Sequence, residues 1–128
     1  MIFDISIYEH WIDNPGNETG SIKDIHLFAD PNDNRDSYAY SLFTELVNEK
    51  DGLWNKKKLI EDDGCCGEVI VKKSDLIYFF DEVNKRYLGE DKFNDLMAKD
   101  EKGIYATERK ELMVIDENRN YRLVAVES

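Results

Sequence analysis

Two segments of this 128-residue chain repeat apolar side chains at spacings of three and four, which is the period of an α-helix. A helix with one apolar face must bury that face against another element, so this pattern constrains the fold more than any other feature. The sequence therefore predicts two helices that contribute to a layered core. The apolar positions are Ala39, Leu42, Phe43, Leu46 and Val47 in the first segment, and Leu76, Phe79, Phe80, Val83 and Tyr87 in the second.

The residues around these segments predict where the helices begin and end. Asp36 or Ser37 is expected to cap the first helix, and Ser74 the second, because their side chains can accept backbone N–H groups. The first helix should end by Asp51-Gly52 and the second at Gly89. A shorter helix is expected over residues 91–99, with Phe93, Leu96 and Met97 on its apolar side.

Other segments show the period of two that is typical of a β-strand. Residues 1–8 alternate apolar and polar side chains, and residues 21–29 follow a turn-rich stretch at 13–20, so an antiparallel hairpin is predicted. A short strand is expected at 68–72. Residues 104–107, 111–115 and 121–126 are expected to form a β-rich tail that ends in a hairpin with its turn at 116–120. Residues 53–67 show no clear pattern, although Trp54 should be buried.

These elements predict an α+β fold formed by a single domain over residues 1–128. Because hairpins are expected at both ends of the chain, the sheet should be mostly antiparallel, with two to three helices packed on one face. No composition break and no internal repeat divides the sequence.

The formal net charge of −11 limits the possible partners. A nucleic-acid-binding protein needs a basic face to neutralise phosphates, and an anionic membrane also attracts basic proteins. We therefore expect neither direct nucleic-acid binding nor membrane binding. The sequence contains no apolar run of about 20 residues that could span a bilayer and no secretion signal at its N-terminus, so a cytoplasmic location is expected.

The negative charge is concentrated in the first half of the chain. Residues 1–64 contain 14 acidic and 6 basic residues, whereas residues 65–128 contain 14 acidic and 11 basic residues. Several aromatic residues lie in the same acidic half, mostly in turn-rich stretches. Aromatic residues surrounded by charged ones are typical of binding hot spots with a polar rim.

Four groups of residues could carry chemistry, and each has a simpler explanation. Adjacent Cys65 and Cys66 could form a redox pair or bind a soft metal, but a disulfide between neighbours requires strained geometry. His10 and His26 could bind a metal together with a nearby carboxylate, but no ligand spacing places them on one face. We interpret the cysteines as reduced thiols and the histidines as surface residues.

The other two groups are partial motifs. Residues 30–36 begin like a calcium-binding loop, but the sixth position is Arg35 and the twelfth is Ser41 where glycine and glutamate are needed. Residues 108–110 contain the Glu-x-Lys fragment of some metal-dependent nucleases, without the basic surface that such enzymes need. We therefore predict no catalytic residue, no metal ligand and no cofactor, and we expect that the chain is not an enzyme.

The leading hypothesis is a small acidic inhibitor that binds a basic protein, most concretely an immunity protein that neutralises a nuclease-type toxin. A nuclease presents a positive cleft, and an acidic protein can cover this cleft without catalytic residues. The alternative is a phage-encoded inhibitor of a host defence nuclease that mimics nucleic acid. A third possibility is a small metal- or thiol-dependent enzyme that uses Cys65, Cys66, His10 or His26.

We expect the partner-binding surface to be formed by acidic residues in loops at the ends of strands, together with aromatic anchors. Loops on a rigid scaffold commonly carry binding residues. The sequence does not indicate an oligomeric state. The predicted partner-binding residues are Trp11, Asp13, Glu18, Asp30, Asp33, Asp36 and Tyr38.

Overall fold

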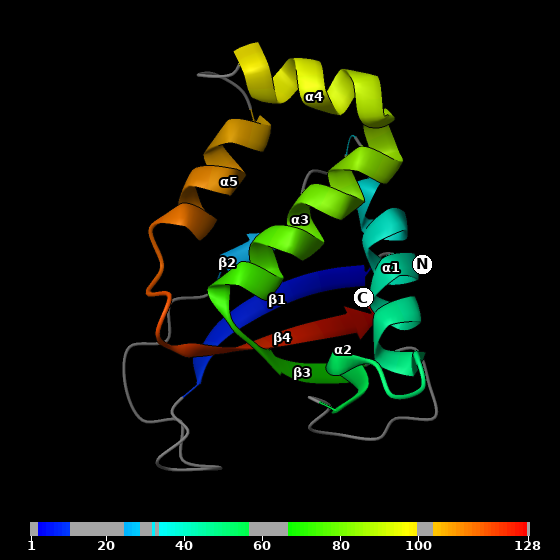
Figure 1. The fold of residues 1–128 in the computed structure, drawn as a ribbon, viewed down its shortest axis with the longest axis vertical. Coiled ribbons are helices and arrows are strands. Elements are labelled where there is room, and N and C mark those ends of the chain that lie inside the picture. Colours follow the sequence, from blue (N-terminus) through cyan, green and yellow to red (C-terminus); the bar gives the residue numbers. More distant parts are fainter. Residues whose placement is uncertain are drawn as a thin grey trace.

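The computed structural model describes residues 3–10, 25–28, 32, 34–56, 67–99 and 104–127. These residues combine helices and strands, as the sequence predicted, but the helices hold more residues than the strands (Figure 1). Five helices occur in the described part of the chain, so the expectation of two to three was wrong. The elements are β1 (Phe3–His10), β2 (Ile25–Leu27), α1 (Arg35–Asn48), α2 (Leu53–Lys56), β3 (Gly67–Val71), α3 (Lys73–Leu88), α4 (Glu90–Lys99), α5 (Ile104–Met113) and β4 (Asn120–Glu127).

The four strands form one sheet in the order β2-β1-β4-β3, and all neighbouring strands are antiparallel. The predicted pairing of the first two strands is confirmed, with Ile7 opposite Ile25. In the centre of the sheet, Leu123 of β4 pairs with Ile7 of β1 on one side and with Val69 of β3 on the other. The last strand therefore lies between β1 and β3, so the predicted C-terminal hairpin was wrong.

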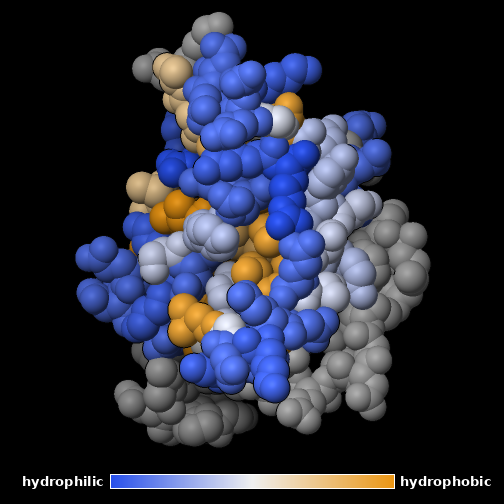
Figure 2. Space-filling model, turned by 45° about the vertical axis from the view of Figure 1, so that its right-hand side comes forward, coloured by the Kyte–Doolittle hydropathy of each residue, from blue (hydrophilic) through white to orange (hydrophobic). Residues whose placement is uncertain are grey.

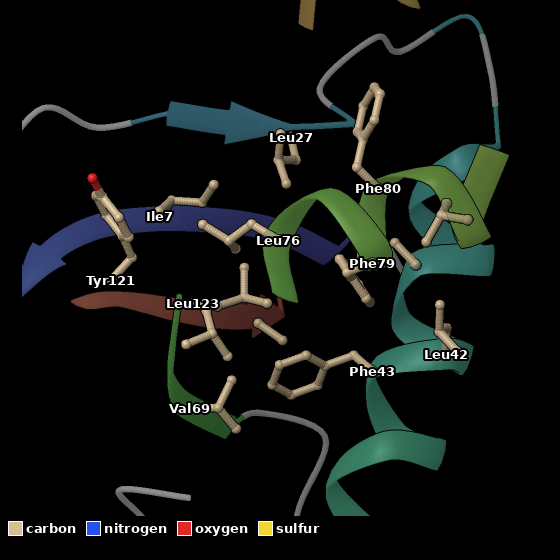
Figure 3. Close-up of a cluster of buried hydrophobic side chains, with 14 of the residues drawn as sticks. Ile7, Leu27, Leu42, Phe43, Val69, Leu76, Phe79, Phe80, Tyr121 and Leu123 are labelled. Carbon is tan, nitrogen blue, oxygen red and sulfur yellow. The ribbon is translucent and has the colours of Figure 1, made fainter. Parts of the chain in front are cut away.

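The core lies between the sheet and helices α3 and α1. Helix α3 crosses the sheet, α1 and α5 lie on either side of α3, and α4 lies beyond its far end (Figure 1). Leu76 of α3 lies between the sheet residues Ile7 and Leu123, while Phe79 lies toward Phe43 of α1 (Figure 3). The predicted helical faces are confirmed by the burial of Leu42, Phe43, Phe79, Phe80 and Val83, while Leu46 packs against the core and is partly buried.

Aromatic rings fill the space where α1, α2 and α3 meet. The Trp54 ring centroid lies 5.5 Å from that of Phe79 and 6.2 Å from that of Phe43. The ring of Phe43 also packs over Gly67, where an added Cβ would lie 3.2 Å from Phe43 Cε1. Burial of Trp54, which the sequence required without placing it, is achieved by the short helix α2.

Residues 104–113 form a helix and not the strands that the sequence analysis predicted. The unbroken apolar run from Leu112 to Ile115 resembled a buried strand. The segment consists largely of strong helix formers, however, and as a helix it buries Leu112 completely while leaving Val114 exposed. Helix propensity and the burial of Leu112 in the core together favour a helix over a strand in this segment.

The predicted helix ends are partly correct. The N-cap of α1 is Asn34 and not Asp36 or Ser37, and the N-cap of α3 is Lys72 and not Ser74. Asp75, the third residue of α3, stabilises the start of this helix, because its Oδ2 accepts the backbone N–H of the N-cap residue Lys72 at 2.9 Å. Gly89 ends α3 with a φ of 86°, a conformation that favours glycine. Among the described residues, no helix is long and apolar enough to cross a membrane.

Candidate functional site

Only two of the predicted partner-binding residues belong to the described part of the chain. Trp11, Asp13, Glu18, Asp30 and Asp33 lie outside it, so their assignment stays a prediction. Asp36 and Tyr38 lie in the first turns of α1. This helix is therefore where the structure can place the candidate site.

Asp36 and Tyr38 have different roles in α1. Asp36 is half-buried, and its Oδ1 accepts the backbone N–H of Ser37 at 2.9 Å, so this carboxylate stabilises the start of its own helix. Tyr38 is 39% exposed, and its ring meets that of Tyr87 on α3 edge-to-face, with 5.6 Å between centroids. Because Tyr87 supports the ring from one side, Tyr38 is held in place while its other side stays open to a partner.

Tyr38 begins a line of exposed side chains along α1. Residues spaced by three and four lie on the same side of a helix, and these positions are all exposed. We call this surface the α1 stripe, and it consists of Tyr38, Ser41 and Glu45 of α1 together with Glu49, the C-cap residue that follows the helix. Figure 2 turns the α1 side of the molecule forward and shows a largely hydrophilic surface with a narrow band of hydrophobic side chains.

The α1 stripe is negatively charged, with one partial compensation. Arg86 Nη2 of α3 lies 2.8 Å from Glu45 Oε2, and both side chains are substantially exposed. The hydrogen bond with Glu45 raises the pKa of Arg86 above its ordinary value, so this guanidinium stays charged. Glu49 makes no ion pair with any residue that the structure describes.

The basic residue at the start of α1 is buried and does not reach the surface. Arg35 is fully buried, and its Nη2 lies 2.8 Å from Glu108 Oε1 of α5. Its Nη1 donates to Asn84 Oδ1 of α3 at 3.4 Å, and its guanidinium lies 5.3 Å from the centroid of the Phe28 ring. Glu108 Oε2 also accepts the backbone N–H of Phe28 at 3.2 Å. We call this group of four residues the Arg35 network.

The Arg35 network joins α1, α3, α5 and the end of β2. Its two charged groups, the Arg35 guanidinium and the Glu108 carboxylate, form an ion pair with each other. Beside it, Arg109 of α5 binds Asp81 of α3 through two contacts of 3.2 and 3.3 Å. The Asn84 Nδ2 atom is buried and finds no hydrogen-bond partner among the described residues. Within the partial nuclease motif at residues 108–110, Glu108 and Arg109 therefore make contacts between helices.

The Arg35 network was not predicted from the sequence, because its members are far apart in the chain. In the sequence, Arg35 stands out only as the wrong residue for the sixth position of a calcium-binding loop. Its partners lie 49 and 73 positions away. The sequence does place an arginine directly before the apolar face of a predicted helix, which could have indicated a buried charge. This pattern does not identify Glu108 or Asn84 as its partners.

The candidate metal ligands are not brought together where the structure describes them. His26 pairs with Ser6, four residues before His10 on β1, which separates the two histidine positions by roughly 13 Å along the strand. Within the described ranges, no three His, Cys, Asp or Glu side chains lie close enough to hold a metal ion. Cys65 and Cys66 lie outside those ranges.

Comparisons with known protein families, with curated proteins and with solved structures found no match.

Proposed function

We propose that this chain is a small acidic inhibitor that binds and neutralises a basic protein, in the manner of an immunity protein acting on a nuclease-type toxin. The net charge of −11 supports a basic partner. A nuclease must present a positive cleft to hold phosphates, and covering that cleft blocks its substrate. Inhibition of this kind requires no catalytic residue of the inhibitor.

The observation that carries the proposal is the composition of the α1 stripe. It combines the aromatic Tyr38, held against Tyr87, with the carboxylates of Glu45 and Glu49. The only basic residue of α1 is Arg35, and its charge is buried against Glu108. The exposed side of α1 therefore offers negative charge and an aromatic anchor without an exposed base of its own.

The two kinds of residue would contribute at different stages of binding. Exposed carboxylates attract a basic partner over several ångströms and increase the association rate, an effect that salt weakens. A supported tyrosine that enters a pocket of the partner slows dissociation. Fast capture matters for an immunity protein, because the toxin must be bound before it acts.

The experiment first identifies the partner by affinity capture and mass spectrometry, and then measures binding with the purified pair. We expect the partner to be basic and to lose nuclease activity at a one-to-one ratio. The association rate should fall when the salt concentration increases from about 20 to about 200 mM, because the Debye length then shortens several-fold. It should also fall for Glu49→Lys.

A matched control separates the α1 stripe from the total charge. Glu111→Lys introduces the same charge change at an exposed position of α5, and it should slow association less than Glu49→Lys. Tyr38→Ala should speed dissociation and cost about 2 kcal/mol of binding free energy if Tyr38 is a hot spot. Equal effects of the two charge reversals, or a captured partner without a basic surface, would contradict the proposal.

A further inference from the structure

A second surface of the molecule has the opposite character to the α1 stripe. An open pocket of about 530 Å³ lies where the start of α3 faces the connection between α5 and β4, at the side of the sheet shown on the left of Figure 1. This volume is within the range of roughly 300–1,000 Å³ that is usual for ligand pockets. Its lining consists of Lys72, Lys73, Ser74, Ile77, Met113, Glu117 and Asn118.

Backbone carbonyls hold the ammonium groups of two lysines that line this pocket. Lys73 Nζ donates to the carbonyl oxygen of Met113, and Lys72 Nζ donates to that of Asn118 at 3.3 Å. A carbonyl fixes the position of an ammonium group without cancelling its charge, and each ammonium keeps further donors for a ligand. Neither lysine forms an ion pair with a residue of the described ranges.

The lining also contains two apolar side chains. Ile77 is half-buried and packs against the core, whereas Met113 is 46% exposed. Val114, the next residue, is 73% exposed, so the apolar surface continues beyond the pocket. Methionine adapts its shape to different apolar partners, which suits it to such a position.

We infer that this pocket is a docking site for a peptide segment of a partner protein that carries a carboxylate next to an aliphatic side chain. Charge complementarity indicates the carboxylate, because the lining contains two lysines and one acidic residue in a chain with a net charge of −11. The exposed Met113 and Val114 indicate the aliphatic side chain, which a free inorganic anion would not contact. This site is independent of the proposed function, which uses the acidic side of α1.

The test is a titration of the isotope-labelled full chain with acetyl-Glu-Leu-Leu-amide, followed by NMR. We expect saturable shifts of the backbone amides of residues 72–77 and 113–118. The probes acetyl-Gln-Leu-Leu-amide and acetyl-Glu-Ser-Ser-amide each lack one of the two features, and each should bind at least fivefold more weakly. Inorganic phosphate that shifts these amides as strongly as the peptide, or the absence of saturable shifts, would overturn the inference.

Variants locate the binding on the pocket. Lys72→Gln combined with Lys73→Gln removes both charges and should weaken peptide binding about tenfold, as expected for the loss of charge-assisted hydrogen bonds. Lys50→Gln combined with Lys92→Gln makes the same charge change at exposed positions elsewhere and should change the affinity less than twofold. Met113→Gln keeps the lysines and should weaken binding at least threefold. Equal effects of the two double variants would overturn the inference.

Discussion

Two arginine–glutamate pairs in this molecule share the same separation and differ in their surroundings. Arg35 Nη2 lies 2.8 Å from Glu108 Oε1, and Arg86 Nη2 lies 2.8 Å from Glu45 Oε2. The side chains of the first pair are 0% and 12% exposed, whereas those of the second are 39% and 57% exposed. Because the separation is equal, a difference in their effect on stability must come from burial and from neighbouring groups.

The buried pair, Arg35 with Glu108, has a structural role, whereas the exposed pair, Arg86 with Glu45, is accessible to a partner. Water solvates both members of the exposed pair, so losing one member costs little. The buried pair has lost that solvation and depends on the other members of the Arg35 network for compensation. Burial thus makes Glu108 part of the fold, while exposure leaves Glu45 able to exchange Arg86 for a partner's charge.

The largest effect is expected for Glu108→Ala. This change leaves the guanidinium of Arg35 buried without its carboxylate, and breaking a buried pair in this way costs about 3–5 kcal/mol. It also removes the acceptor of the Phe28 N–H. The free energy of unfolding, measured by urea denaturation, should fall by this amount.

Two further variants sharpen this prediction. Glu111→Ala removes an exposed carboxylate from the same helix and should change the free energy of unfolding by less than about 0.5 kcal/mol. Replacing both partners, as in Arg35→Met with Glu108→Leu, should recover part of the loss because no buried charge is left unpaired. If Glu108→Ala cost no more than Glu111→Ala, the distinction between the buried and the exposed pair would be wrong.

The next prediction concerns the helix that carries Glu108. Leu112→Ala should destabilise the protein by about 2–5 kcal/mol, because Leu112 is fully buried. Val114→Ala should have an effect of less than about 0.5 kcal/mol, because Val114 is 73% exposed. In the strand predicted from the sequence, both side chains would lie on the same face. Similar losses for the two variants in urea denaturation would therefore contradict the helix.

A smaller effect is expected when the aromatic member of the Arg35 network is changed. Phe28 stacks on Phe80 with 5.5 Å between ring centroids, and it faces the guanidinium of Arg35. Phe28→Leu keeps an apolar side chain but removes the ring, so we expect a loss of about 1–2 kcal/mol. In the double variant with Glu108→Ala, the change in the free energy of unfolding should differ from the sum of the two single changes, because both substitutions act on Arg35.

The same contrast between local and distant partners explains how much of the fold could be predicted. Helices α1 and α3 were predicted correctly because their apolar period is a local property of the sequence. The pairing of β1 with β2 was also predicted correctly. The position of β4 between β1 and β3 depends on contacts across 50 residues or more, and no short pattern encodes it.

The candidate site shows the same limit. Tyr38 was predicted as a binding residue from its acidic and aromatic surroundings; it is exposed, and its role in binding stays a prediction. Asp36 looked equivalent in the sequence, but its carboxylate accepts the N–H of Ser37. Glu45 and Glu49 were not singled out, although the predicted helix spaces them in line with Tyr38; the structure adds that all three side chains are exposed.

The smallest effect is expected for the exposed pair, measured by a double-mutant cycle with Glu45→Gln and Arg86→Gln. The coupling free energy should be less than about 1 kcal/mol at low salt. It should decrease further at about 1 M salt, where the Debye length is about 3 Å. Because the pKa of Arg86 is raised, the contribution of its charge is complete below its unfolded-state pKa and is lost only as the pH rises through the folded-state value.

The coupling free energy should therefore be constant from pH 7 to pH 9. Measuring it across this pH range is the control for the salt titration, because the charge of Arg86 does not change there. Two outcomes would contradict this prediction: a coupling free energy as large as the loss of unfolding free energy in Glu108→Ala, or a coupling free energy that does not change with salt. Either would mean that Arg86 binds Glu45 as strongly as Arg35 binds Glu108. Glu45 would then not be free to attract a basic partner, and the negative charge of the α1 stripe would depend on Glu49 alone.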